Sequence, residues 1–190
     1  CPSRCSYCSF VSHSIEKTKR LIPAYLEKLK EELRYTAAIA AEKGLVLQTI
    51  YMGGGTPTVL TAEQLRDLLQ TVNSAFDRSR CMEFTVEAGR PDTICRDKLQ
   101  ALVEGGVDRV SVNPQTLNDQ VLRQVGRRHT AAEFLAAYSL AKSMPFTAIN
   151  VDLIAGLTGD TVESFRDTLD RIIALKPGNI TVHSLTMKRA

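Results

Sequence analysis

The chain contains 190 residues, of which 44% are hydrophobic and 24% are charged, and its formal net charge is +3. This length and composition suit one domain with one well-filled core, and they exclude a disordered or fibrous chain. Lys and Arg are scattered among Asp and Glu, so we expect no nucleic-acid partner. No apolar run approaches the roughly 18 residues of a membrane span and no signal-peptide pattern is present, so we expect a cytoplasmic location and no membrane partner.

The chain opens on a short segment in which three cysteines are spaced C-x3-C-x2-C: Cys1, Cys5 and Cys8. Iron–sulfur clusters are held by cysteine thiolates, usually four, so three close thiols without a nearby fourth indicate a cluster in which one iron lacks a protein ligand. A Cys3His zinc site that includes His13 is the alternative. The odd number and low density of cysteines favour a reducing compartment over a disulfide framework. The remaining two are expected to be half-buried free thiols: Cys81 and Cys95.

Elements of secondary structure follow this segment in regular alternation. Residues 23–43 carry one apolar stripe at helical spacing, which predicts an amphipathic helix. Residues 45–52 are β-rich and mostly apolar, which predicts a strand that is buried on both faces and runs into the glycines at 53–55. A capping box at Thr61 and Gln64 then begins the next helix.

The same alternation continues through the rest of the chain. We predict further strands over 82–88, 107–113, 147–154 and 179–185. The helices are expected over 61–76, 92–104, 118–125, 131–144 and 161–175. Strands that alternate with helices indicate crossover units and a parallel sheet. A strand before Cys1 would complete a first unit, so the predicted fold class is α/β: a partial (β/α)6 barrel with a parallel sheet, whose first strand and later elements are missing from a chain that is cut at both ends.

Ligands of parallel α/β folds bind at the carboxyl ends of the strands, where the loops converge. Polar and glycine residues of this sequence gather at those predicted ends: Gly53, Glu87, Asn113, Asp152 and His183. Each one alone is an ordinary loop residue or a buried polar group that backbone N–H groups satisfy. Together they indicate a binding site at that edge of the sheet.

The cysteine spacing resembles the signature of the radical S-adenosylmethionine (SAM) superfamily. That resemblance implies that Cys1, Cys5 and Cys8 hold a 4Fe-4S cluster whose free iron chelates SAM, and that an electron from the cluster cleaves SAM to a 5′-deoxyadenosyl radical. The run Gly53-Gly54-Gly55-Thr56-Pro57, placed after a strand, is similar to the superfamily motif whose backbone meets the SAM amino group. Backbone approach that close requires residues without Cβ. Residues 1–190 are therefore expected to form one radical SAM core domain.

Four later segments extend the resemblance through the chain and narrow it to the oxygen-independent coproporphyrinogen III oxidase family. They are TVEAGRPD at 85–92, RVSVNPQ at 109–115, GRRH at 126–129 and NVDLIAGL at 150–157. The family implies one SAM contact in each segment: Glu87, Gln115, Arg127 near the SAM carboxylate and Asp152 at the ribose. The sequence of residues 85–92 is most similar to that of the coproporphyrinogen dehydrogenase branch of the family.

This family resemblance implies a radical oxidoreductase of porphyrin and haem biosynthesis. It would oxidatively decarboxylate two propionates of coproporphyrinogen III to vinyl groups, which gives protoporphyrinogen IX. The cofactors would be the cluster and SAM, with a reduced flavodoxin-like or ferredoxin-like electron donor as partner, and no other group is expected to be catalytic. A porphyrinogen substrate with four carboxylates also requires cations near the barrel mouth. The candidates are Arg4, Lys17, Lys19 and Arg20.

Phe10 departs from the best-known family members, which carry a fourth cysteine at that position. Relatives without that cysteine include haem-binding chaperones, so a haem-transfer protein in which the cluster serves regulation is the second hypothesis. A zinc-stabilised binding module is the third, and it leaves the glycine loop and the strand-end acids unexplained. Haem affinity against porphyrinogen turnover separates the first two hypotheses, and metal analysis separates both from the third.

Overall fold

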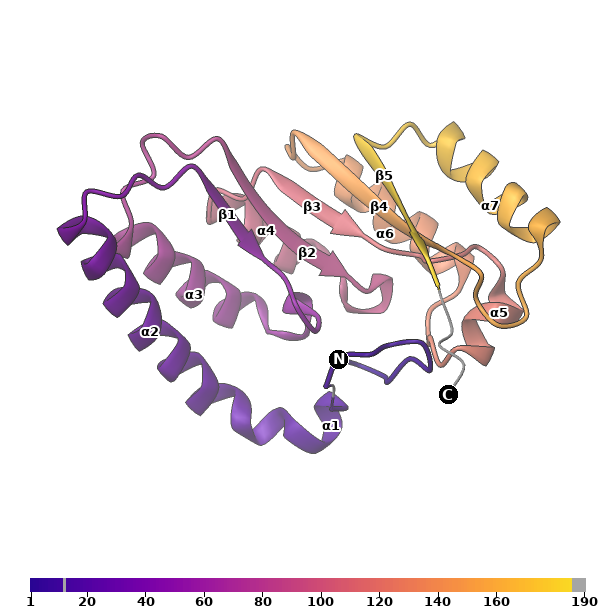
Figure 1. The fold of residues 1–190 in the computed structure, drawn as a ribbon, viewed down its shortest axis with the longest axis horizontal. Coiled ribbons are helices and arrows are strands. Elements are labelled where there is room, and N and C mark those ends of the chain that lie inside the picture. Colours follow the sequence, from indigo (N-terminus) through magenta and orange to yellow (C-terminus); the bar gives the residue numbers. More distant parts are fainter. Residues whose placement is uncertain (12, 186–190) are drawn as a thin grey trace.

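The computed structural model describes residues 1–11 and 13–185 and shows one parallel sheet flanked by helices (Figure 1). Five strands pair in the order β1-β2-β3-β4-β5, so every strand lies beside its neighbour in the sequence. The strands are β1 (Thr49–Met52), β2 (Glu83–Gly89), β3 (Arg109–Val112), β4 (Ala148–Ala155) and β5 (Asn179–Ser184). All four pairings are parallel, and the sheet curls into a half-barrel. The predicted α/β class is confirmed.

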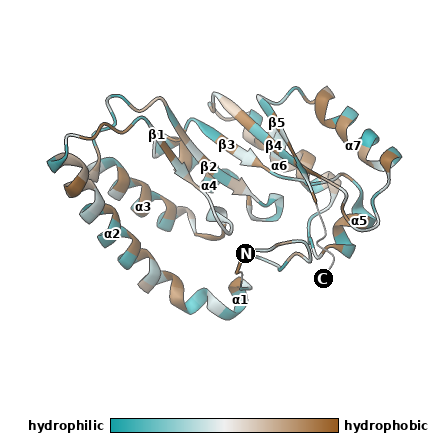
Figure 2. Cartoon of the chain, in the orientation of Figure 1, coloured by the Kyte–Doolittle hydropathy of each residue, from teal (hydrophilic) through white to brown (hydrophobic). Residues whose placement is uncertain are grey.

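Helices connect consecutive strands. The longer ones are α2 (Ile22–Glu42), α3 (Ala62–Ala75), α4 (Arg96–Glu104), α6 (Ala131–Lys142) and α7 (Val162–Ala174). The short ones are α1 (Ile15–Thr18), α5 (Asp119–Gln124) and the 3-10 turns η1 (Lys19–Leu21), η2 (Pro57–Val59) and η3 (Pro91–Thr93). Hydrophobic and hydrophilic residues alternate along α2, α3 and α7, as expected for helices that bury one face (Figure 2). Among the described residues, no helix is long and apolar enough to cross a membrane.

The core lies between the sheet and its helices. Its largest fully buried side chains include Phe84, Phe134, Leu65, Leu69, Leu99 and Leu102. Burying a side chain of this kind contributes about 1.5–3 kcal/mol. The predicted capping box is confirmed at the start of α3, where Thr61 N–H donates to Gln64 Oε1 at 3.0 Å and Gln64 N–H donates to Thr61 Oγ1 at 3.2 Å. A packed core and defined helix starts give the strand ends a rigid support.

The strand predicted over 45–52 is shorter and less buried than expected. β1 begins at Thr49, and Leu45 and Val46 are 65% and 50% exposed. β1 pairs only with β2, because it forms one edge of the described sheet. An edge strand lacks a neighbour on one side, so the apolar residues beside it stay uncovered. The prediction of a strand buried on both faces is therefore wrong.

The helix predicted from Asp92 begins later, at Arg96. Residues 91–93 instead form η3. The Thr93 hydroxyl donates to Arg90 O at 2.8 Å, a local side-chain bond to the backbone that competes with helix formation. Hydrophobic periodicity does not report such a bond, so the start of the helix was misplaced.

Candidate functional site

The cysteine loop, residues 1–8, lies at the carboxyl end of the sheet, where the sequence predicts a binding site (Figure 1). It is tied to the segment after α5, because Ser6 N–H donates to Val125 O at 3.0 Å and the Ser3 hydroxyl donates to Gly126 O at 2.7 Å. Gly126 has φ +80°, and a Cβ there would lie 2.7 Å from a backbone oxygen of the cysteine loop. Only glycine permits that approach.

The three predicted cluster ligands have three different surroundings. Cys1 Sγ lies 3.2 Å from Gly55 O. Cys5 is 5% exposed, and its sulfur accepts a hydrogen bond from Arg90 at 3.0 Å. Cys8 is half-buried, and its backbone N–H donates to Cys5 O at 3.2 Å, which closes the loop. All three are free thiols, the donor set that iron–sulfur ligation requires.

The state of the cysteines also bears on the two alternatives to a cluster. All five are free, so the structure contains no disulfide framework in its described part. Outside the cysteine loop, Cys81 is half-buried as predicted, whereas Cys95 is exposed because it stands at the surface as the N-cap of α4. Within residues 1–11 and 13–185, no three His, Cys, Asp or Glu side chains are arranged around a single metal ion. This holds for the predicted cluster ligands as much as for a Cys3His zinc site with His13, so the zinc alternative stays a prediction.

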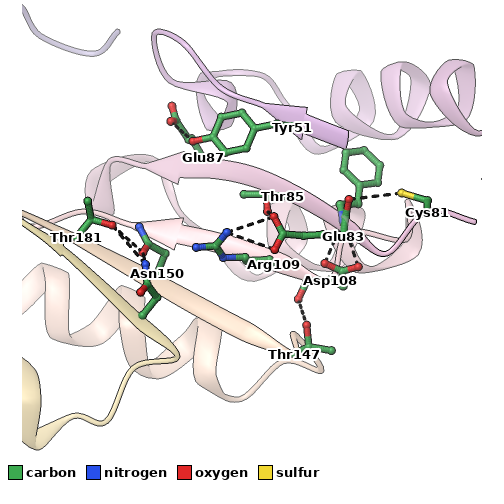
Figure 3. A network of polar contacts seen from close by, with 12 residues as sticks. Tyr51, Cys81, Glu83, Thr85, Glu87, Asp108, Arg109, Thr147, Asn150 and Thr181 are labelled. Carbon is green, nitrogen blue, oxygen red and sulfur yellow. Dashed lines mark hydrogen bonds and ion pairs between the residues drawn. The ribbon is translucent and has the colours of Figure 1, made fainter. Parts of the chain in front are cut away.

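The glycine loop, residues 53–55, follows β1 and lies against Glu87 of β2. Gly54 N–H donates to Glu87 Oε2 at 3.1 Å, and the Tyr51 hydroxyl donates to Oε1 of the same carboxylate (Figure 3). A Cβ on Gly53 would lie 2.6 Å from Tyr51 Cε1, and Gly54 has φ +109°. Gly53 is therefore required because a larger residue would collide with Tyr51. Gly54 is required because its backbone adopts a conformation that favours glycine. Partial desolvation and the hydrogen bond to Glu87 raise the pKa of Tyr51 to about 12, so its hydroxyl keeps the proton that it donates.

Thr56 joins the glycine loop to the cysteine loop. Its side chain is 6% exposed, and its hydroxyl lies 3.6 Å from Cys1 Sγ. Its carbonyl accepts from Val59 N–H at 3.1 Å, which starts η2. Two motifs far apart in the sequence thus meet at one residue.

β3 and β4 bring Asn113, Gln115 and Asp152 together. Asp152 Oδ2 accepts from Asn113 Nδ2 at 2.8 Å, and Asp152 Oδ1 accepts from Asn150 Nδ2 at 2.6 Å. Gln115 N–H donates to Asp152 O at 3.1 Å, and Gln115 has φ +70°. Among the described residues, Gln115 Oε1 is buried without a hydrogen-bond partner. An unpaired buried acceptor and a strained backbone are both uncommon away from functional sites.

Arg127 connects the cysteine loop to the end of β3. It is 7% exposed, and it donates from Nε to the Tyr7 hydroxyl at 3.1 Å and from Nη1 to Asn113 O at 3.0 Å. Burial raises the pKa of Tyr7 to about 12, against the opposing effect of Arg127. Burial and Arg127 together lower the pKa of the buried His129 to about 4. At neutral pH, Arg127 therefore stands near an uncharged phenol and an uncharged imidazole.

Arg90 is a buried member of the site that the sequence analysis missed. It is 5% exposed, and its Nη1 and Nη2 donate to Ser3 Oγ and Ser3 O, each at 2.9 Å. Nη2 also donates to Cys5 Sγ at 3.0 Å. Burial, and then the nearby charge of Arg127, lowers the pKa of the Arg90 guanidinium. The sequence feature that could have indicated Arg90 is its position three residues after Glu87, within the segment TVEAGRPD that resembles the family.

Two hollows adjoin these groups. A polar pocket of about 200 Å³ on the inner face of the sheet is lined by Glu87, Arg109 and Asp152 among other polar side chains. Figure 3 shows Arg109 pointing toward Glu83, with which it forms an ion pair at 3.2 Å. Two of the predicted acids, from β2 and β4, therefore face one cavity. The larger hollow is an apolar groove of about 650 Å³ between α2 and β1, which reaches Cys1.

The four cations predicted to meet a tetracarboxylate lie in the cysteine loop, α1 and η1. All four are exposed: Arg4, Lys17, Lys19 and Arg20. Their exposure makes them accessible to an anionic ligand, and their role in substrate binding stays a prediction.

A parallel half-barrel with polar and cysteine side chains at the carboxyl ends of its strands places this chain in the class of α/β barrel proteins. A family model described as the radical SAM superfamily matches residues 1–172. The chain belongs to the radical SAM superfamily, as its cysteine and glycine motifs predicted.

The most informative relatives carry porphyrin-related names. An oxygen-independent coproporphyrinogen-III oxidase-like protein, HemZ of Bacillus subtilis, is 41% identical over 192 residues, which cover 100% of this chain and 38% of that protein. The heme chaperone HemW of Lactococcus lactis is 35% identical over 188 residues, which cover 99% of this chain and 47% of that protein. The structure of coproporphyrinogen III oxidase HemN from Escherichia coli, described as a radical SAM enzyme, matches with a TM-score of 0.84 and 30% identity over 98% of this chain and 42% of its own.

These likenesses confirm the resemblance to the oxygen-independent coproporphyrinogen III oxidase family. The similarity to HemZ covers the whole chain, whereas each relative extends well beyond the matched part. The chain spans less than half the length of the curated relatives it matches.

Proposed function

We propose that residues 1–190 form the radical SAM core domain of a longer protein that oxidatively decarboxylates two propionates of coproporphyrinogen III to vinyl groups. The observation that carries this proposal is the contact of Cys1, in a loop with three free thiols, with a glycine loop whose backbone binds the acid Glu87. Similarity to the oxidase-like HemZ and to the oxidase HemN supports the choice of substrate.

The residues at this edge fit a 4Fe-4S cluster and SAM. Cys1, Cys5 and Cys8 supply three thiols from one closed loop. Gly53 stands where a Cβ would collide with neighbouring side chains, and Gln115 offers a buried acceptor that lacks a partner among the described residues. When bound, the cluster and SAM supply one-electron radical chemistry.

Asp152 and Arg127 are held in place by their neighbours. The amides of Asn113 and Asn150 donate to the two carboxylate oxygens of Asp152, so the carboxylate is fixed and can accept from ligand hydroxyls with its remaining lone pairs. The Tyr7 hydroxyl and Asn113 O fix the Arg127 guanidinium. We assign Asp152 to the SAM ribose and Arg127 to the SAM carboxylate, since charge-assisted hydrogen bonds suit both tasks.

Anaerobic turnover tests the proposed reaction. The longer protein is incubated with SAM, coproporphyrinogen III and a reduced flavodoxin-like or ferredoxin-like donor, and the expected products are the two-vinyl porphyrinogen and methionine. Replacing Cys5 with Ala should abolish both products, because it removes a cluster ligand. Replacing Lys17 and Lys19 with Glu should raise the KM for substrate, because both side chains are exposed near the cysteine loop. Cleavage of SAM that leaves coproporphyrinogen III intact would contradict the proposal.

A haem chaperone is the second candidate, and a specific likeness favours it. HemW of Lactococcus lactis matches 99% of this chain at 35% identity. Titration of the same protein with haem, followed by absorbance, tests this candidate. Tight haem binding together with untouched coproporphyrinogen III assigns the chain to the chaperone class, and turnover without haem binding assigns it to the oxidases.

We place the protein in the cytoplasm. Five free cysteines suit a reducing compartment. Fractionation of the producing cells tests this location, and recovery of the protein outside the cytoplasmic fraction would overturn it.

A further inference from the structure

A buried arginine contacts the sulfur of a predicted cluster ligand. Arg90 follows β2 and lies 85 positions from Cys5 in the sequence, yet its Nη2 donates to Cys5 Sγ at 3.0 Å. The same nitrogen donates to Ser3 O at 2.9 Å, and Nη1 donates to Ser3 Oγ at 2.9 Å. One guanidinium thus holds a backbone oxygen, a hydroxyl and a sulfur of the cysteine loop at once.

Asp92 favours the charge of this arginine from a distance, without a direct ion pair among the described residues. None of the ion pairs among the described residues involves Arg90, although the side chain is 5% exposed. A buried charge without a partner of opposite sign is costly. The sulfur of Cys5 is the partner within hydrogen-bond reach that carries negative charge when it ligates iron.

Among the described residues, no charged donor contacts the sulfurs of the other two predicted ligands. Cys1 Sγ faces the neutral Thr56 hydroxyl at 3.6 Å and the carbonyl oxygen of Gly55 at 3.2 Å. Cys8 is half-buried, and the contact that the structure gives it is through its backbone N–H. The guanidinium therefore acts on one sulfur of the three.

We propose that Arg90 is a positioning residue that sets the reduction potential of the cluster through its hydrogen bond to Cys5 Sγ. This inference rests on the cluster part of the proposed function. Hydrogen bonds to ligand sulfurs and the charge around a cluster are established determinants of its potential. A donor with positive charge draws electron density from the sulfur and favours the reduced cluster, so Arg90 raises the potential. The step it influences is the transfer of one electron from the external donor to the cluster, in which no bond forms or breaks.

Three variants of the full-length protein test the inference. Arg90→Gln removes the charge and shortens the reach toward the sulfur, and Arg90→Lys keeps the charge but cannot donate to Ser3 and Cys5 through one planar fork. Arg123→Gln is the matched control, because Arg123 is exposed and the substitution changes the net charge by the same amount. Each protein is reconstituted anaerobically, its iron and sulfide are measured, and its midpoint potential is read by EPR during a redox titration.

We expect the potential to fall in the order wild type, Arg90→Lys, Arg90→Gln, with Arg123→Gln equal to the wild type. Unchanged potentials in both Arg90 variants with full iron content would overturn the inference. If Arg90→Gln loses its iron, Arg90→Lys decides, and a wild-type potential in that variant overturns the inference. A wild-type protein that binds no cluster is a different outcome, because it contradicts the proposed function itself.

Discussion

The two sides of the candidate site are held together in different ways. The Cys5 side consists of Ser3, Cys5, Tyr7, Arg90, Gly126 and Arg127, and the glycine-loop side consists of Cys1, Tyr51, residues 53–56 and Glu87. On the Cys5 side, Arg90 and Arg127 are at most 7% exposed, and each donates hydrogen bonds to the cysteine loop. On the glycine-loop side, Tyr51 is 62% exposed and the fit depends on missing Cβ atoms.

This difference has a physical consequence. Buried charges must keep their partners, so the Cys5 side is rigid and any change there costs stability as well as binding. Small residues leave space without forming strong bonds, so the glycine-loop side stays open to a ligand. Substitutions should therefore reduce stability on the first side and mainly affinity on the second.

The largest effect is expected for Gly126→Ala on the Cys5 side. An alanine at φ +80° costs roughly 1–2 kcal/mol, and its Cβ would lie 2.7 Å from a backbone oxygen that cannot move away cheaply, which adds about 1–3 kcal/mol. The free energy of unfolding from urea titration measures the loss. Gly44→Ala is the control, because Gly44 has φ +62° but nothing within 4 Å of its Cβ position. Equal losses in the two variants would show that the contact with the cysteine loop does not matter.

Lowering the pH should reduce the free energy of unfolding, because His129, which lies near Arg127 of the Cys5 side, must then be protonated in a buried position. The pKa of His129 is lowered from 6.5 to about 4 in the folded chain, so its contribution to stability is fully present above pH 6.5 and is lost as the pH falls toward 4. A shift of this size corresponds to about 3 kcal/mol. The free energy of unfolding, measured at several pH values, should decline less steeply in His129→Gln than in the wild type.

Replacement of the exposed His13 by Gln should leave the wild-type decline intact. Parallel pH profiles for the wild type and His129→Gln would show that His129 is not the responsible group.

The next largest effect is expected on SAM binding when a charged group of the site is removed. Asp152→Ala and Arg127→Ala each remove charge-assisted bonds of roughly 1.5–3 kcal/mol, so each should reduce SAM affinity by about tenfold or more. Calorimetric titration of the reconstituted protein with SAM measures the change. Asp97→Ala is the control, because Asp97 is exposed on α4. Unchanged affinity in both site variants would place the SAM pocket elsewhere.

The smallest effect is expected on the glycine-loop side. In Gly53→Ala the new Cβ would lie 2.6 Å from the Tyr51 ring edge, a side chain that can shift, so the cost is about 1 kcal/mol, or about fivefold in SAM affinity. Gly55→Ala meets only Cys1 Sγ at 3.5 Å, an ordinary contact, and should bind SAM more tightly than Gly53→Ala. The same calorimetric titration compares the two variants. If Gly53→Ala lost as much free energy of unfolding as Gly126→Ala, the contrast between the two sides would be contradicted.

Much of the fold was predictable because hydrophobic spacing records which face of an element is buried. The helix predicted over 23–43 matches α2 to within one residue at each end, and all five strands lie within the predicted ranges or extend them by one residue. Predictions failed at η3, where one hydroxyl contact redirects the backbone, and at residues 45–48, which lie beside an edge strand. Both depend on neighbours that are distant in the sequence or on a single local bond.

The sequence by itself determined the types of groups available: three close thiols, a glycine loop, and the acids Glu87 and Asp152 at strand ends. It did so because their spacing and the residues around them are local properties. Only the tertiary structure decided which groups meet, including the contacts of Arg90 with Cys5 and of Asn113 with Asp152. Parallel pairing aligns the ends of strands that are far apart along the chain, and burial then makes each charge depend on the partners placed beside it.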